Sequence, residues 1–232
     1  MKILALDTAM NGCAVAVWDA GGDEAVSAVE PMLCGHAERL VPLAQNILTE
    51  AHLDFSDIDL IATTVGPGAF TGLRIGLSAA RAMGLALDVP VVGVTTLDVL
   101  AASYLARHQD PHNLLVLIET KRSDFYGQLF SPAGDILSEP FALPAEQISA
   151  LYLVDSIVLI GDASQRFLSL LLQEQKAGVV VRTGFEVPDP AHLARLAYRQ
   201  YASGGYLTPP KPLYLREADI SQSRKTQRKI AE

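Results

Sequence analysis

The chain carries the stretch Val65-Gly66-Pro67-Gly68-Ala69-Phe70-Thr71-Gly72-Leu73-Arg74-Ile75-Gly76 between two segments of different pattern. The apolar run 60–65 is typical of a strand, and residues 73–87 have the periodicity of a helix. A glycine-rich turn lets the backbone approach a ligand closely and points free N–H groups and the positive end of a helix dipole at it. We therefore expect either an anion site here or a tight turn that packs a helix closely on a sheet.

Composition limits the class of protein. The 232 residues are 50% hydrophobic and 19% charged, which predicts a large core in one domain or two small lobes. The net charge of −8 argues against broad nonspecific nucleic-acid binding. Cys13 and Cys34 form no metal or redox motif, so we expect reduced thiols in or near the core of a cytoplasmic protein. Asp7 interrupts the first apolar run, which excludes a signal peptide, and no uncharged apolar run reaches membrane-spanning length.

Apolar periodicity divides the chain into two similar series of elements. The first series is expected to contain strands 2–7, 13–18, 25–30, 60–65 and 89–94 and helices 36–52, 73–87 and 97–107. The second is expected to contain strands 114–119, 125–130, 156–160 and 179–182 and helices 166–173 and 191–202. Meandering strands followed by βα units, repeated, predict a duplicated α/β fold with mixed sheets.

The domain organisation follows from this repeat. We expect a first lobe over residues 1–108 and a second, smaller lobe over 109–220, beginning with a linker at 109–113. Helix 191–202 could belong to the second lobe or pack back on the first. Residues 221–232 are polar and basic without apolar periodicity, so we expect a disordered tail.

Small residues recur every fourth position along helix 73–87 and the turn before it. Gly72, Gly76, Ala80 and Gly84 form a flat stripe against which another backbone can pack, although glycine in a helix costs about 1 kcal/mol relative to alanine. The stripe therefore indicates a packing requirement. Its partner is either the sheet of the same lobe or another subunit.

Several polar groups follow predicted strands. Asp7 and Thr8 end the first strand, where an acid could bind a metal-phosphate or activate water, or where the pair could simply cap a turn. The others are Glu119, Lys121, Arg122 and Asp124, which either line a cleft or form a solvated hairpin, and Gly161-Asp162, which either holds a nucleoside or turns the chain.

Motifs of metal and nucleophilic catalysis are missing from the sequence. The five histidines show no pairing typical of a helical metal site, and neither H-E-x-x-H nor G-x-S-x-G occurs. No nucleophile, base or metal constellation can be assembled. The sequence therefore predicts no catalytic residue and no metal site.

Four segments together resemble the bacterial TsaB (YeaZ) family of tRNA threonylcarbamoyladenosine biosynthesis proteins: residues 3–9, 66–76, 91–97 and 212–216. The resemblance covers essentially the whole chain except the basic tail. It implies an actin-like ASKHA fold of two lobes, each with a mixed sheet flanked by helices. It also implies a place in the machinery that installs N6-threonylcarbamoyladenosine beside the anticodon of ANN-reading tRNAs.

The paralogous catalytic family, TsaD, carries a metal-binding H-x-x-x-H after the strand that corresponds to residues 89–94. This chain has Thr96 and Leu100 at the two histidine positions, and neither side chain suits a transition metal. The resemblance thus implies a non-catalytic subunit that supports a TsaD-type transferase. It further implies a TsaE-type ATPase and tRNA as partners within the complex, a homodimer in isolation, and no cofactor of the chain's own, with ATP or ADP compatible with the complex.

The resemblance also directs the choice of site residues. The expected anion- or nucleotide-binding residues are Asp7, Thr8, Gly66, Gly68 and Thr71. The expected partner interface comprises Leu40, Ala44, Ile47, Gly72, Gly76, Ala80 and Met83. Alternatives are an ASKHA-type ATPase that uses Asp7, a peptidase-like enzyme, which the missing nucleophile disfavours, and a tRNA-binding module at residues 224–229, for which a solubilising tail is the simpler explanation.

Overall fold

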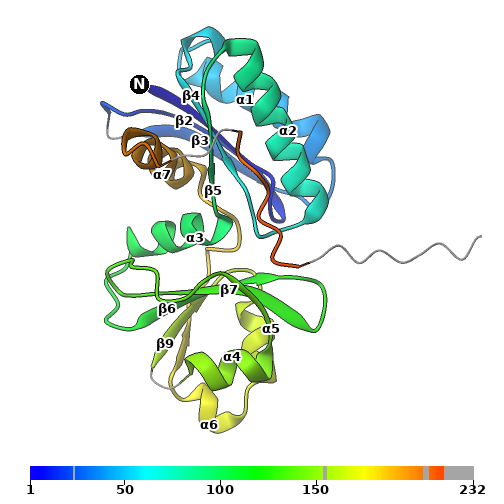
Figure 1. Cartoon of the computed structure of the whole chain (residues 1–232), viewed down its shortest axis with the longest axis vertical. Coiled ribbons are helices and arrows are strands. Elements are labelled where there is room, and N and C mark those ends of the chain that lie inside the picture. Colours follow the sequence, from blue (N-terminus) through cyan, green and yellow to red (C-terminus); the bar gives the residue numbers. More distant parts are fainter. Residues whose placement is uncertain (23, 154–155, 206–208, 217–232) are drawn as a thin grey trace, which may run out of the picture.

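The computed structural model describes residues 1–22, 24–153, 156–205 and 209–216, and within them the chain forms two lobes along its long axis (Figure 1). The first sheet has the order β3-β2-β1-β4-β5 and the second β10-β9-β6-β7-β8. The strands of the first sheet are β1 (Lys2–Asp7), β2 (Gly12–Asp19), β3 (Ala25–Pro31), β4 (Leu60–Thr64) and β5 (Val91–Val94). Those of the second are β6 (Asn113–Glu119), β7 (Asp124–Phe130), β8 (Phe141–Pro144), β9 (Ile157–Ile160) and β10 (Val179–Val181).

The two sheets repeat one topology. In each, the first three strands along the chain pair antiparallel and the remaining two pair parallel. The middle residues of the central strands β1 and β6 are all apolar and buried, as expected for strands that are covered on both faces of the sheet. This duplication confirms the predicted α/β fold of two lobes, each with a mixed sheet flanked by helices.

The helices cover both faces of each sheet (Figure 1). They are α1 (His36–Glu50), α2 (Phe70–Leu87), α3 (Thr96–Leu105), α4 (Ala145–Tyr152), α5 (Ser164–Leu170), α6 (Gln173–Lys176) and α7 (Pro190–Ala202), with a 3-10 turn η1 (Phe55–Asp57). Helices α1 and α2 lie on one face of the first sheet and α7 on the other. Helix α3 lies between the lobes, with Leu100 and Tyr104 in one cluster with Leu114 and Val158 of the second sheet. Each sheet is thus covered by a helix from the other half of the chain.

Some predicted elements need correction. Helix α2 begins at Phe70, three residues before the predicted start, and α1 ends at Glu50, two residues before the predicted end. The segment 141–152 forms β8 and α4, which were not predicted, and the predicted helix 166–173 is two short helices, α5 and α6. Cys34 is exposed, whereas Cys13 is buried as expected.

The small-residue stripe of α2 packs on the sheet of its own lobe. A Cβ atom at Gly72 would overlap the Thr8 carbonyl oxygen, and one at Gly76 would lie 2.8 Å from the Thr8 hydroxyl oxygen. Ala80 is fully buried in the first-lobe core, and a Cβ at Gly84 would overlap Val91. The intramolecular alternative therefore explains the stripe, because the glycines let α2 approach the end of β1 and strand β5.

Residues 209–216, hereafter the strap, connect the two lobes at the end of the described chain (Figure 1). The Leu213 N–H donates to the Val65 carbonyl oxygen at 2.7 Å, and Arg81 donates to the Pro210 carbonyl oxygen. Arg216 forms an ion pair with Asp124 of β7. The predicted tail at 221–232 lies outside the described residues. None of the helices in the described part of the chain combines the length and apolar character needed to cross a membrane.

Candidate functional site

A cleft of about 710 Å³ opens between the lobes. The first lobe contributes the turn 8–11, the loop 33–38 and the start of α2 at 68–72. The second lobe contributes residues 118–122 and Asp162. The carboxyl end of β1 and the glycine-rich turn thus meet at this cleft, as their place after parallel-paired strands predicts.

The five predicted anion-binding residues separate into two groups. Thr8, Gly68 and Thr71 line the cleft. Gly66 and Asp7 do not: a Cβ at Gly66 would lie 2.9 Å from the strap's Leu213 carbonyl oxygen, and Asp7 is fully buried. Gly66 and Asp7 lie outside the cleft wall, because the strap covers one and the fold interior encloses the other. Their part in anion binding stays a prediction.

The environment of Asp7 is closed and mostly apolar. Its Oδ1 accepts hydrogen bonds from the Thr64 hydroxyl at 2.5 Å and the Ala9 N–H at 3.2 Å. Its Oδ2 has no hydrogen-bond partner among the described residues. Burial raises the pKa of Asp7 from 3.8 to about 6, and the two hydrogen bonds only partly oppose this.

The start of α2 keeps features of an anion site. The Ala69 N–H donates to the Ala9 carbonyl oxygen at 2.7 Å, but no side chain caps the helix. The first-turn N–H groups of Phe70 and Thr71 therefore lie at the cleft wall without an intrahelical acceptor. A Cβ at Gly68 would overlap the Ala9 carbonyl oxygen, so the tight-turn explanation accounts for this glycine. Anion binding here stays a prediction.

The second-lobe wall is a structured ionic cluster rather than a solvated hairpin. Arg166 binds both carboxylate oxygens of Glu119, at 2.6 and 2.8 Å, and stacks 3.8 Å above the Phe125 ring. The Glu119 N–H donates to Asp162 Oδ1 at 2.8 Å. Burial, and after it the nearby charge of Glu119, raises the pKa of Asp162 to about 6. Lys121 and Arg122 also line the cleft.

A second depression, hereafter the α1–α2 groove, lies on the outer side of the first lobe. It has a volume of about 560 Å³ and is mostly apolar. Its lining residues are Ala37, Leu40, Val41, Phe70, Thr71, Arg74, Ile75, Ser78 and Ala79. The groove exists because the inner faces of both helices are committed to the sheet, which leaves a channel between their outer faces.

Most residues predicted for a partner interface lie under this groove. Buried inside the first lobe are Leu40, Ala44, Ile47, Gly72, Gly76 and Ala80, and Met83 is partly buried against the same core. Leu40 also lines the groove, whereas the other side chains face the core of the first lobe, because apolar periodicity marks the face turned to the sheet. Val41, next to Leu40, is exposed in the groove. The partner interface itself stays a prediction.

Comparisons with known proteins identify the family. A family model described as TsaD, tRNA N6-adenosine threonylcarbamoyltransferase, matches residues 31–152, more than half of the chain. The tRNA threonylcarbamoyladenosine biosynthesis protein TsaB of Escherichia coli is 36% identical over 126 residues, 54% of this chain and 53% of that protein. The structure of YeaZ from Pseudomonas aeruginosa superposes with a TM-score of 0.79 at 27% identity, covering 92% of this chain and 99% of the other. The chain belongs to the family that the TsaD model describes, in its TsaB (YeaZ) branch.

The alignment with a further TsaB relative covers more of the chain, but not all of it. TsaB of Haemophilus influenzae is 28% identical over 165 residues, 65% of this chain and 68% of that protein. The chain thus spans about half the length of the Escherichia coli relative that it matches. The structural match to YeaZ of Pseudomonas aeruginosa, by contrast, covers 92% of this chain.

The start of α3 carries the two positions at which the TsaD family has histidines. Thr96 and Leu100, at the positions of the two TsaD histidines, are both fully buried. Neither side chain lines the cleft. Among the residues that the structure describes, His, Cys, Asp and Glu nowhere gather in threes around a possible metal position.

Proposed function

We propose that the chain is a subunit that supports a TsaD-type transferase in forming N6-threonylcarbamoyladenosine in ANN-reading tRNAs. It acts in the cytoplasm and does not carry the transferase site itself. The family model and the names of the TsaB relatives support the pathway. The burial of Thr96 and Leu100, at the positions of the TsaD histidines, supports a non-catalytic role for this chain.

One observation carries the supporting role. Asp7, Thr96 and Leu100 occupy the positions where an ATPase acid or a metal pair would be needed, and all three are fully buried. A group that acts on a substrate must reach it within hydrogen-bond distance. The cleft wall of this chain instead consists of an ionic cluster, small residues and a helix start. The alternative of an ATPase or peptidase-like enzyme acting by itself is not favoured.

The α1–α2 groove is the surface that we assign to the TsaD-type subunit. It is mostly apolar and open, and Val41 is 45% exposed along it. Clustered exposed apolar residues on a soluble fold indicate a protein interface. A second copy of the chain occupies the same groove in isolation, while the TsaE-type ATPase and tRNA join the assembled complex.

Reconstitution tests the proposed function. The chain is mixed with a TsaD-type subunit, a TsaE-type ATPase, threonylcarbamoyl-adenylate and tRNA, and modified adenosine is measured with and without it. We expect modification to depend on the chain and the chain alone to produce none. Modification by the chain without the TsaD-type subunit would overturn the supporting role, and full activity without the chain would overturn any role in the reaction.

Matched variants on α1 and α2 test the docking surface. Val41→Glu places a charge inside the groove, whereas Leu85→Glu places the same charge on α2 at a position that is 87% exposed and outside the groove. Burying an unpaired charge costs several kcal/mol, so we expect Val41→Glu to abolish co-elution with the TsaD-type subunit. Leu85→Glu should co-elute normally. Equal binding by both variants would exclude this groove as the interface.

A further inference from the structure

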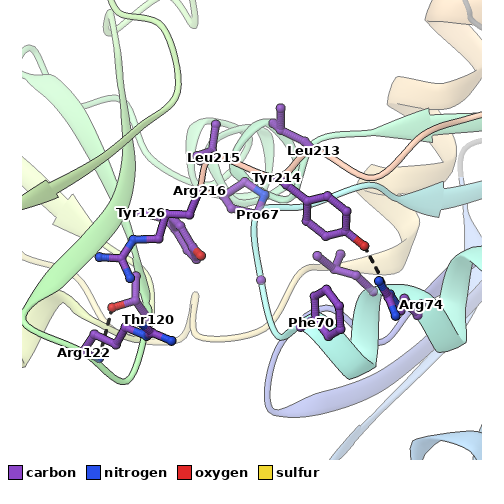
Figure 2. A pocket seen from close by; sticks show the side chains of 12 residues that line it. Pro67, Phe70, Arg74, Thr120, Arg122, Tyr126, Leu213, Tyr214, Leu215 and Arg216 are labelled. Carbon is purple, nitrogen blue, oxygen red and sulfur yellow. Dashed lines mark hydrogen bonds between the residues drawn. The ribbon is translucent and has the colours of Figure 1, made fainter. Parts of the chain in front are cut away.

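A pocket of about 410 Å³ adjoins the cleft, between the start of α2, the β6–β7 turn and the strap (Figure 2). Its lining comes from three parts of the chain that are distant in sequence: residues 67–74, 120–126 and 213–216. The backbone bond from Leu213 to Val65 fixes the strap at its edge. The volume lies near the lower end of the range for small-ligand sites, so it admits a small group and excludes a duplex.

Aromatic rings form one side of this pocket. The Phe70 and Tyr214 rings have centroids 5.7 Å apart at an interplanar angle of 33°, and the two residues are 52% and 46% exposed. Tyr126 lines the pocket from β7 in the second lobe (Figure 2). Large rings left this exposed, and held by the strap, are available to stack on a planar group.

Guanidinium groups form the rest of its polar surface. Arg74 lies 3.8 Å above the Phe70 ring and its Nε is 3.3 Å from the Tyr214 hydroxyl. Arg122 enters from the β6–β7 turn, and Arg216 enters from the strap while paired with Asp124. Among the described residues that line the pocket, none is Asp or Glu. Three arginines therefore converge on one cavity in a chain whose net charge is −8.

We propose that this pocket binds one unpaired nucleotide of an RNA strand, with its base on the rings and its phosphate at the arginines. Unpaired RNA bases are recognised by stacking on aromatic and arginine planes, and guanidinium groups bind phosphate oxygens in pairs. This inference rests on the proposed function, which supplies a tRNA with an unpaired anticodon loop. It gives the acidic chain one local RNA contact without general affinity for nucleic acid.

A strand, and not only a free nucleotide, can occupy this pocket. The pocket and the larger cleft share lining residues, namely Gly68, Phe70, Thr120, Arg122 and Tyr126. The nucleotides on either side of a bound one therefore have room to continue along the cleft.

Fluorescence anisotropy with a labelled anticodon stem-loop of an ANN-reading tRNA tests the proposal on the full-length chain. Loss of one base stack, in Tyr214→Leu, should weaken binding between about fivefold and 150-fold, and Tyr214→Phe should restore it. Arg122→Gln should lower the slope of log affinity against log salt by about 0.7, the value for one phosphate on a single strand. Arg182→Gln removes the same charge from the Asp110 ion pair on the same lobe and should change neither affinity nor slope.

The results separate this inference from the proposed function. Equal RNA affinity for the wild-type chain, Tyr214→Leu and Arg122→Gln overturns the pocket, and so does a wild-type chain that binds AMP but not the stem-loop. Deleting residues 217–232 should leave the Tyr214→Leu effect intact; if the effect disappears with the tail, the pocket is not the contact. Because binding is measured without the transferase, a chain that binds RNA in the pocket but fails in reconstitution refutes only the supporting role.

Discussion

Replacing Asp7 by asparagine should stabilise the protein at neutral pH. The carboxyl group is fully buried, accepts two hydrogen bonds on Oδ1, and has no partner for Oδ2 within the described part of the chain. Burial penalises the charged form and raises the pKa of Asp7 from 3.8 to about 6. Asparagine keeps the size and the Oδ1 acceptor but carries no charge.

The direction of the pH dependence follows from the two pKa values. In the unfolded chain Asp7 releases its proton near pH 3.8, whereas the folded protein holds the proton up to about pH 6. Folding is therefore most favourable when the carboxyl is protonated in both states, and stability is lost as the pH rises from about 4 to above 6. A shift of about 2 pKa units corresponds to about 3 kcal/mol of lost stability at neutral pH.

Urea unfolding followed by the fluorescence of Trp18, the sole tryptophan, measures this in the first lobe. We expect Asp7→Asn to raise the free energy of unfolding by about 2 kcal/mol at pH 7.5, since its unpartnered amide N–H groups offset part of the gain. At pH 4.5 the difference should nearly vanish. Asp88→Asn, which removes a charge from the exposed end of α2, should show no such pH-dependent difference. A stability change that is equal at both pH values would refute the reasoning.

Two further changes test the packing. Gly72→Val should lower the free energy of unfolding by more than about 2 kcal/mol, because its side chain would overlap the Thr8 carbonyl oxygen; circular dichroism melting checks this, and a wild-type melting temperature would contradict the close approach. Arg166→Gln should cost about 2 kcal/mol, since it breaks a two-bond ion pair and a ring contact. Arg39→Gln also breaks a two-bond pair, with Glu30, but this pair is more exposed and should cost under about 1 kcal/mol. Urea denaturation ranks the two, and equal costs would mean that the Phe125 contact adds nothing.

Sequence periodicity predicted the fold well, because the lobes are built from strong apolar repeats. The elements that it missed, β8 and α4, lie in 141–152, where every strand residue is only half-buried and the alternation is therefore weak. The same periodicity selected buried residues for the predicted partner interface. Residues such as Ala44 and Ile47 mark the buried face of α1, and an exposed partner surface has no comparable pattern.

The site could be predicted less completely, because pockets form between segments that are distant in sequence. The glycine-rich turn was found from its own residues, and Thr8, Gly68 and Thr71 do line the cleft. Arg74 and Tyr214 stand in segments that carry the family resemblance, but their contact with each other gave no signal, since it depends on where the strap crosses α2. The Arg216 ion pair, the Arg81 hydrogen bond to Pro210 and the Leu213 backbone bond hold the strap in this place.

The Asp7→Asn variant also distinguishes an ATPase from a supporting subunit. If it were the acid of an ATPase, Asp7→Asn would lose ATP turnover while gaining stability, as is typical of a strained functional group. If the carboxyl is only a buried remnant of the fold, the same variant gains stability and still supports modification of tRNA. The closed environment around Oδ2 favours the second outcome, because a group that no ligand can reach contributes only its desolvation cost. A more stable Asp7→Asn variant that no longer supports the TsaD-type subunit would return Asp7 to the chemistry.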